Sequence, residues 1–208
     1  MREQLRPMRL ALGVALALLL GACATPITHP VQMAYRGAVQ PETDQVTSVG
    51  IQPFYDRRNE ADRHVIGYRQ LGHGERERYV SSPDDVARAV TRMATELVRQ
   101  KGGEPGDLKG WDFSPDRMLT LSDAFDVFIG GEIERLRCDA EKRLMHTRMV
   151  LELDIVVYVG KVREGIVHRR PVSMRTERVA ATFGPRELQQ FLNDMLSRGL
   201  ERGCKGVP

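Results

Sequence analysis

The sequence predicts an α+β domain in which an antiparallel or mixed sheet of about four to five strands carries two main helices on one face. One segment, residues 145–159, alternates apolar and polar side chains, and a period of two is typical of a half-buried strand. Two other segments, residues 86–97 and 188–200, repeat apolar side chains at helical spacing. Packing both helices on the sheet would bury all three apolar surfaces, which favours this architecture.

Four strands are expected along the chain, together with one less regular hairpin. Residues 46–54 form the first strand, which Pro53 ends or places at an edge. Residues 65–80 contain several glycines and indicate a loose hairpin. Residues 125–137 form the second strand, where Gly130 and Gly131 indicate a bulge or a close backbone approach. The alternating segment is the third strand, and the fourth runs to about Val179 with Val172, Met174 and Thr176 on one face.

Each helix begins at a recognisable start signal. Residues 82–85 offer Ser82 as the cap, Pro83 in the first turn and two carboxylates at the positive end of the helix dipole, and Gly102-Gly103 ends this helix. Gly184 and the proline after it begin the last helix. Between them, residues 103–121 are expected to form a long connection with one helical turn after Ser114. The stripe of the last helix is Leu188, Phe191, Leu192, Met195, Leu196 and Leu200.

The N-terminus has the pattern of an export signal. Three arginines precede the 11 apolar residues 10–20, and small residues follow before Cys23. A membrane-spanning helix would need about 20 apolar residues, so we expect residues 1–22 to be removed. The remaining 208 − 22 = 186 residues suit one domain of ordinary size. Residues 23–45 are expected to be a flexible tether, and residues 46–204 a single α+β domain.

This segment resembles a bacterial lipoprotein signal peptide. The resemblance implies that Cys23 becomes the lipid-modified first residue of the mature protein; the alternative is an ordinary buried cysteine. In lipoproteins of this kind an aspartate after the cysteine retains the protein at the inner membrane, and Ala24 stands there instead. The resemblance therefore implies an outer-membrane protein with its domain in the periplasm.

Charge and composition exclude some partners and leave others open. The signal segment holds three arginines and one glutamate, so the net charge falls from +3 for the whole chain to about +1 after cleavage. A nucleic-acid partner would normally need a strongly basic face, and export removes the protein from nucleic acid. The membrane, reached through Cys23, and a protein of the cell envelope are the expected partners. The oligomeric state stays open.

Catalytic, cofactor and metal sites are not predicted. The five histidines have no pair at the spacing of a helical zinc motif, and we interpret them as surface residues: His29, His64, His73, His146 and His168. The sequence also lacks the glycine-rich turn of a serine nucleophile and the lysine of a phosphate-binding loop. We therefore expect a protein that is not an enzyme and needs no cofactor.

Three groups of residues are weighed as candidate sites. Asp56-Arg57-Arg58 could bind an anion through its guanidinium groups, but a structural ion pair that fixes a loop is favoured. Glu132 and Glu134 would share one side of a strand, where a solvated face is favoured over an acid–base pair. The methionines on the apolar stripes are interpreted as core residues: Met145, Met149, Met174 and Met195.

Cys138 and Cys204 would be the only free thiols once Cys23 carries lipid. An even number of cysteines in an oxidising compartment favours a disulfide. A meander of the last three strands, followed by an antiparallel helix about 24 Å long, would place the two residues at opposite ends of the domain. We expect them to remain unpaired within one chain, because bridged Cα atoms lie within about 7 Å.

Four segments together resemble the YajG-like family of bacterial lipoproteins: residues 49–58, Ile66-Gly67, the end of the first helix and residues 122–133. The shared pattern is a strand, a D-x-R loop, an I-G, a helix and a strand with G-x-I, and it covers about residues 46–203. Auxiliary lipoproteins of lipid-transfer transporters and activator lipoproteins of peptidoglycan synthases share much of this order of elements. The resemblance implies an outer-membrane anchor and a non-catalytic domain; the insert at residues 103–121 departs from it.

Two functions follow as hypotheses. The first is a lipid-anchored, non-catalytic interaction or scaffold module that positions another envelope protein. The alternative is a carrier or sensor of a small apolar ligand, such as a lipid or wall fragment, held between the sheet and the helices. The alternative requires an internal apolar cavity that buries most of the ligand.

Overall fold

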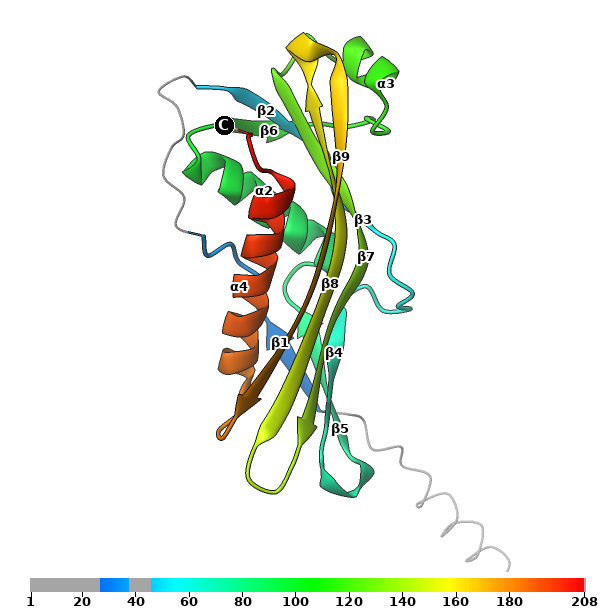
Figure 1. The fold of residues 1–208 in the computed structure, drawn as a ribbon. Helices are drawn as coiled ribbons and strands as arrows, with labels where there is room; N and C mark the ends of the chain where they lie inside the picture. Colours follow the sequence, from blue (N-terminus) through cyan, green and yellow to red (C-terminus); the bar gives the residue numbers. More distant parts are fainter. Residues whose placement is uncertain (1–26, 38–45, 208) are drawn as a thin grey trace, which may run out of the picture.

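The computed structural model describes residues 27–37 and 46–207, and confirms an α+β fold (Figure 1). The signal segment, Cys23 and Ala24 lie outside the described residues. The strands are β1 (Thr28–Val31), β2 (Ser48–Ile51), β3 (Tyr55–Asp56), β4 (Val65–Gln70), β5 (Arg76–Ser81), β6 (Glu104–Asp107), β7 (Val127–Lys142), β8 (Thr147–Lys161) and β9 (Ile166–Ala180). The helices are α2 (Val86–Gln100), α3 (Pro115–Thr120) and α4 (Pro185–Gly203), with 3₁₀ turns η1 (Gly72–Gly74) and η2 (Val162–Glu164).

The sheet is larger than expected: the described strands form one mixed, nine-stranded sheet instead of four to five strands. Strand β7 organises it. One edge of β7 pairs along its length with β8, which pairs in turn with β9, and both pairings are antiparallel. The other edge carries β2, β3 and β4 one after another, all parallel to β7. The meander β7-β8-β9 confirms the predicted second, third and fourth strands, and β4 and β5 confirm the hairpin.

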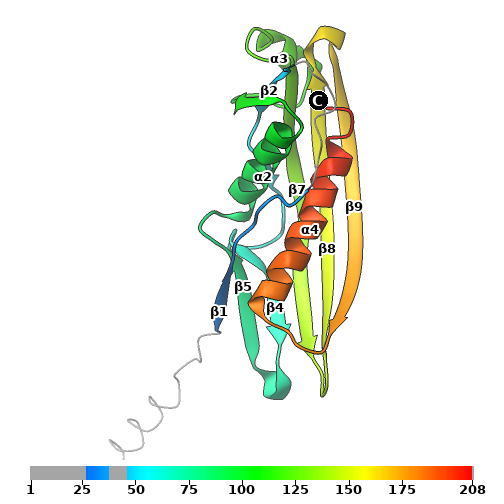
Figure 2. The ribbon, with the colours of Figure 1, turned by 90° about the vertical axis from the view of Figure 1, so that its left-hand side faces the viewer.

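Helices α2 and α4 lie on the same face of the sheet, as predicted (Figure 2). Every residue of the predicted α4 stripe is buried, and α2 buries its stripe in the same core. At Gly199 and Gly203 the helix approaches β8 so closely that an added Cβ would lie 2.7 Å from a side-chain atom of Leu153 and 2.4 Å from one of Val157. Two glycines on the inner face of α4 therefore set the distance between helix and sheet.

Helix α2 begins later than the sequence analysis expected. The cap is Asp85, whose carboxylate accepts the backbone N–H of Arg88 at 2.9 Å. Ser82 and Pro83 precede the helix, so neither caps it nor occupies its first turn. A carboxylate at the N-cap satisfies a free backbone N–H and also meets the positive end of the dipole.

In β7 the bulge lies at Glu134, three residues after the second glycine, Gly131. Glu134 has no partner on β8, since Ile133 pairs with Ile155 and Arg135 with Asp154. The extra residue keeps apolar side chains on the helix side, with odd positions buried before the bulge and even positions after it. Gly130 and Gly131 serve the other predicted role, close approach: an added Cβ at Gly131 would lie 2.4 Å from Phe54.

Residues 27–37 were expected to belong to a flexible tether, and that expectation is wrong for them. Strand β1 pairs in parallel with β5, and Val31, Met33 and Tyr35 are buried. Alternate backbone N–H groups of the segment donate to three side chains spaced by four residues on α4. These hydrogen bonds run from Gln32 to Gln189 (3.0 Å), from Ala34 to Asn193 (3.2 Å) and from Arg36 to Ser197 (2.8 Å).

The insert at residues 103–121 covers the opposite face of the sheet at one end. It contains an unexpected edge strand, β6, which pairs in parallel with β2. The predicted helical turn is α3, capped by Ser114. Leu108, Trp111 and Met118 of the insert pack on Phe128 in a second apolar cluster. Phe128 alternates along β7 with residues of the main core, so this cluster lies across the sheet from α2 and α4.

The turn between β7 and β8 corrects another prediction. Arg143 donates its backbone N–H to the carbonyl of His146 at 2.8 Å, so β8 starts at Thr147 and Met145 lies in the turn. Met145 is 86% exposed instead of buried. Met149 and Met195 are core residues as predicted, and Met174 packs against the core. Among the described residues, the helices are too short or too polar to cross a membrane.

Candidate functional site

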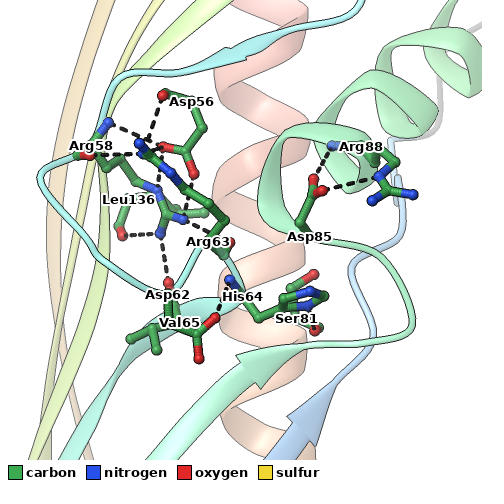
Figure 3. A network of polar contacts seen from close by, with 10 residues as sticks. All are labelled: Asp56, Arg58, Asp62, Arg63, His64, Val65, Ser81, Asp85, Arg88 and Leu136. Carbon is green, nitrogen blue, oxygen red and sulfur yellow. Dashed lines mark hydrogen bonds and ion pairs between the residues drawn. The ribbon is translucent and has the colours of Figure 1, made fainter.

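The Asp56–Arg58 cluster forms a buried network of polar contacts between β3 and β4 (Figure 3). The Arg58 side chain is 3% exposed and the Asp56 side chain 7%. Arg58 donates Nε to Oδ1 of Asp56 at 2.9 Å and Nη2 to Oδ2 at 2.8 Å. Its guanidinium also donates to the carbonyls of Val65 (2.6 Å), Arg63 (3.0 Å) and Leu136 (3.4 Å).

This network supports the structural interpretation of the cluster. Nε, Nη1 and Nη2 of Arg58 all donate to protein atoms, and the side chain is closed off from solvent. Asp56 also accepts the Arg58 backbone N–H at 3.0 Å, which fixes the turn after β3. The cluster therefore ties that turn to the start of β4 and to β7. Arg57, between the two, is different: its side chain is 62% exposed and points out of the network.

Arg57 lines a depression of about 490 Å³ on the sheet face away from α2 and α4. We call it the aromatic hollow. Strands β3, β7 and β8 supply its floor, and the insert supplies its wall. Its lining residues are Tyr55, Arg57, Asp112, Phe113, Ser114, Glu132 and Tyr158.

Three aromatic rings give the hollow its shape. Phe113 stacks face to face on Tyr158, with centroids 4.2 Å apart and planes within 1°. Tyr55 meets Phe113 edge-on, with ring centroids 5.6 Å apart. Trp111 packs on Phe113 as well, with centroids 5.2 Å apart. Gly130 lies beneath: an added Cβ there would come within 2.7 Å of the Phe113 ring. The predicted close approach at Gly130 thus makes room for Phe113.

Charged and polar groups cross the hollow. Arg57 donates Nε to Oε1 of Glu132 at 3.1 Å, and its guanidinium carbon lies 5.5 Å from the centroid of the Tyr55 ring. The Tyr158 hydroxyl donates to the other oxygen of Glu132 at 3.3 Å. At the rim, hydrogen bonds from Ser114 lower the pKa of Asp112. Asp112 is thus ionised at neutral pH, and the carboxylates of Asp112 and Glu132 each accept hydrogen bonds from protein donors.

Phe113 is held in a backbone conformation that side-chain-bearing residues rarely adopt. Its φ is +69°, the only positive value at a non-glycine residue in the described chain. Such a conformation costs about 1–3 kcal/mol and persists where the surroundings fix it, often at functional sites. Here packing against Tyr55, Trp111 and Tyr158 fixes the backbone conformation of Phe113, and this conformation places the Phe113 ring in the lining of the hollow.

The other sequence candidates do not converge. Glu132 lies in the hollow, but the bulge separates it from Glu134, which is exposed. His29 stacks on Tyr79, and His64 Nδ1 lies 3.0 Å from the Ser81 carbonyl. Within the described residues, histidine, cysteine, aspartate and glutamate side chains form no group of three or more suited to a metal ion.

Cys138 and Cys204 are both buried and both free thiols, as the meander argument expected. Cys138 pairs across the sheet with Leu151, whereas Gly203, beside Cys204, contacts Val157. Six residues along β8 correspond to about 20 Å. Burial raises the pKa of each thiol to about 12.

Comparison with known proteins gives weak likenesses. Models of protein families and curated proteins yield no match. Among solved structures, protein XCC0632 from Xanthomonas campestris, of the DUF330 family, has a TM-score of 0.48 and 8% identity, covering 84% of this chain and 96% of its own. Lipoprotein GNA1162 from Neisseria meningitidis has a TM-score of 0.41 and 6% identity over 73% of this chain and 96% of its own. The hypothetical protein CT253 from Chlamydia trachomatis has a TM-score of 0.43 and 9% identity, covering 77% of this chain and 99% of its own.

One of these similar structures is a bacterial lipoprotein by its name. The likenesses are too weak to support an argument about function, and membership of the YajG-like family is unconfirmed. The candidate site therefore depends on its own geometry. Sequence reasoning named Glu132 and Arg57 but missed Tyr55, Phe113 and Tyr158.

Proposed function

We propose that the protein is an outer-membrane lipoprotein, acylated at Cys23, whose periplasmic domain is a non-catalytic interaction module that binds another envelope protein through the aromatic hollow. The observation that carries this proposal is the composition of the hollow: three aromatic rings around an exposed arginine and a half-buried glutamate. Tyrosine, phenylalanine and arginine are the side chains enriched where proteins bind one another.

The preorganisation of the hollow supports binding. Stacking on Tyr158 and packing against Trp111 hold Phe113 in one orientation, so little side-chain entropy remains to be lost when a partner binds. The Arg57–Glu132 pair offers one donor and one acceptor beside the rings. A protruding apolar side chain of the partner, flanked by polar groups, would complement these features.

A non-catalytic role suits the chemistry of the lining residues. Ser114 donates its hydroxyl to Asp112 at 2.6 Å and accepts the Arg117 backbone N–H as the cap of α3. A serine nucleophile needs an effective general base, and Asp112 is a weak one because hydrogen bonds from Ser114 lower its pKa. Both carboxylate oxygens of Glu132 accept hydrogen bonds from protein donors, Oε1 from Arg57 and Oε2 from Tyr158.

The alternative of a carrier for an apolar ligand finds no support between α4 and the sheet. That space is filled by the main core, and an added Cβ at Gly199 or Gly203 would already lie 2.7 Å from Leu153 or 2.4 Å from Val157. Two further depressions of the described surface, over β4, β5, β7, β8 and β9, are lined mainly by charged side chains. A depression of about 240 Å³ near the C-terminus is lined by four valines and four charged residues. A carrier would need a largely apolar cavity.

Site-specific photo-crosslinking in cells tests the proposal. A photoreactive phenylalanine analogue replaces Tyr55 in the full chain, and in a control replaces Arg198, which is exposed on α4 across the sheet. We expect position 55 to yield a discrete adduct with one envelope protein and position 198 to yield none. Absence of an adduct at position 55 in several growth states, or the same adduct from both positions, would argue against the hollow as the binding surface.

A further inference from the structure

The register of the sheet brings several chain turns to one end of the molecule. Gln70, at the end of β4, pairs with Glu141, and Thr147 pairs with Ala180. The β4–β5 turn, the β7–β8 turn and the β9–α4 connection therefore lie at the same end. Strand β1 starts there too, because Thr28 pairs with Arg78, near the start of β5. We call this the β1 end; Figure 1 shows it at the bottom.

The anchoring residue is tied to this end by a short piece of chain. Cys23 and Thr28 are five residues apart, and five extended residues span at most about 18 Å. Beyond Thr28 the chain is fixed, by pairing with β5 and by the three hydrogen bonds to α4. A lipid on Cys23 would thus hold the β1 end beside the bilayer, and the expected long tether would not lift the domain away.

The β7–β8 turn at this end exposes two large apolar side chains together. Leu144 is 105% exposed and Met145 is 86% exposed, and Ile27, next to β1, is 62% exposed. Lys142 and Arg143 precede the apolar pair. Adjacent apolar side chains at a projecting turn indicate contact with an apolar phase, and lysine and arginine stems can extend toward lipid headgroups.

We infer that Leu144 and Met145 insert into the membrane that holds the lipid anchor, so that the β7–β8 turn is a second attachment point and fixes the orientation of the domain. This inference rests on the proposed acylation of Cys23. The occupant of the surface is the apolar layer of a phospholipid bilayer. A second copy of the chain or a partner protein on this turn is the competing outcome.

Fluorescence quenching by brominated lipid tests the insertion. The chain has a single tryptophan, Trp111, which is 1% exposed and packs beneath α3 at the other end of β7. It gives the same background in every variant. The test variant is Leu144→Trp, and the control is Leu119→Trp on α3, where the leucine is 51% exposed. Phe128, in the α3 cluster, and Lys142 are 14 residues apart on β7, or about 46 Å.

Each full chain is purified after maturation in cells and reconstituted in vesicles of phosphatidylethanolamine and phosphatidylglycerol, with and without brominated acyl chains. We expect the added emission of Leu144→Trp to shift to the blue in vesicles and to be lost with brominated lipid, whereas that of Leu119→Trp is retained. Equal retention in both variants, or a blue shift at position 144 without quenching, would overturn the inference in favour of a protein contact.

Mass spectrometry of the N-terminal peptide separates this failure from that of the anchor. An acylated protein that floats with vesicles but shows no quenching at position 144 would leave the anchor intact and refute the inserted turn. A protein that is not acylated at Cys23 would refute the anchor, and with it the argument that places the β1 end at the bilayer.

Discussion

Replacing Asp56 by alanine removes the carboxylate from a guanidinium that has no access to water. Arg58 would lose both short hydrogen bonds to Asp56, and its remaining acceptors would be the carbonyls of Val65, Arg63 and Leu136. Breaking a buried ion pair by removing one partner costs about 3–5 kcal/mol. The three carbonyls continue to solvate the cation, so we expect the lower end, about 3 kcal/mol.

The adjacent arginine provides the control. Arg57 is 62% exposed and pairs with Glu132 at the surface, so Arg57→Ala should change the free energy of unfolding by about 1 kcal/mol or less. For a domain of this size, 1 kcal/mol corresponds to about 2–4 °C in Tm. Asp56→Ala should therefore lower Tm by about 6–12 °C in a calorimetric scan, and Arg57→Ala by no more than about 4 °C.

Partner binding should show the reverse order. Well below its Tm, Asp56→Ala should retain the crosslink from position 55, because the hollow is formed by other side chains. Arg57→Ala should weaken it, because Arg57 lines the hollow. Unchanged stability of Asp56→Ala together with loss of the crosslink would refute the structural role of the cluster and make Asp56 part of the binding surface.

Outcomes are expected for four further variants. Gly203→Ala should lower the free energy of unfolding by about 1–3 kcal/mol, since the new Cβ meets a branched valine at 2.4 Å. Gly199→Ala should be nearly neutral, because it meets the end of a flexible leucine and gains about 1 kcal/mol of helix propensity; equal losses in chemical denaturation would contradict the close packing. Cys23→Ser should leave the protein unprocessed or release it from membranes, and normal maturation with sedimentation in the outer membrane would refute the anchor. Burial raises the pKa of Cys138 and Cys204 from 9.0 to about 12, so the stability that depends on their protonated forms is present below pH 9 and is lost as pH rises toward 12. Cys204→Ala should flatten that loss, and a linked Cys138–Cys204 peptide after alkylation of the native protein would show that the thiols are paired.

Long periodic elements could be predicted from the sequence, and short ones could not. Strand β8 and helices α2 and α4 each have an apolar period sustained over many residues, because each buries one face against a large core. Strands β3 and β6 have two and four residues, too few to establish a period, and β6 contains a proline and a glycine that favour a loop. The extent of the sheet was underestimated for this reason.

Strand β1 and the segment after it escaped prediction for a different reason. Val31, Met33 and Tyr35 alternate with Gln32, Ala34 and Arg36, but the prolines around them favour a tether. This segment is held in place by residues near the other end of the chain: Asn193 and Ser197, buried on α4, accept hydrogen bonds from its backbone. Polar residues within an apolar helical stripe are the signal that could have indicated a backbone partner.

The aromatic hollow was beyond sequence reasoning because it combines single aromatics from separate elements. Tyr55 begins the two-residue strand β3, Phe113 lies in the insert and Tyr158 lies on the outer face of β8. Tyr55 and Phe113 belong to no periodic pattern, and Tyr158 occupies one of the outward positions of the alternating segment 145–159, where the period gives no sign of a site. The glycine pair did carry a signal, since Gly130 leaves the space that the Phe113 ring fills.

The two proposals together place the aromatic hollow at a defined distance from the membrane. Glu132 and Lys142 are ten residues apart on β7, so the aromatic hollow would stand about 33 Å from the inserted turn, in the periplasm. The sheet face between them carries ion pairs that neutralise one another, including Arg148 with Glu177 and Arg175 with Glu152. Such a paired face remains solvated, which leaves the hollow as the part of this face where aromatic side chains gather. A rigid sheet held at two points would therefore present the hollow at a fixed distance and orientation to a partner, and lengthening the chain between Cys23 and Thr28 should disturb that presentation only if the β7–β8 turn does not insert.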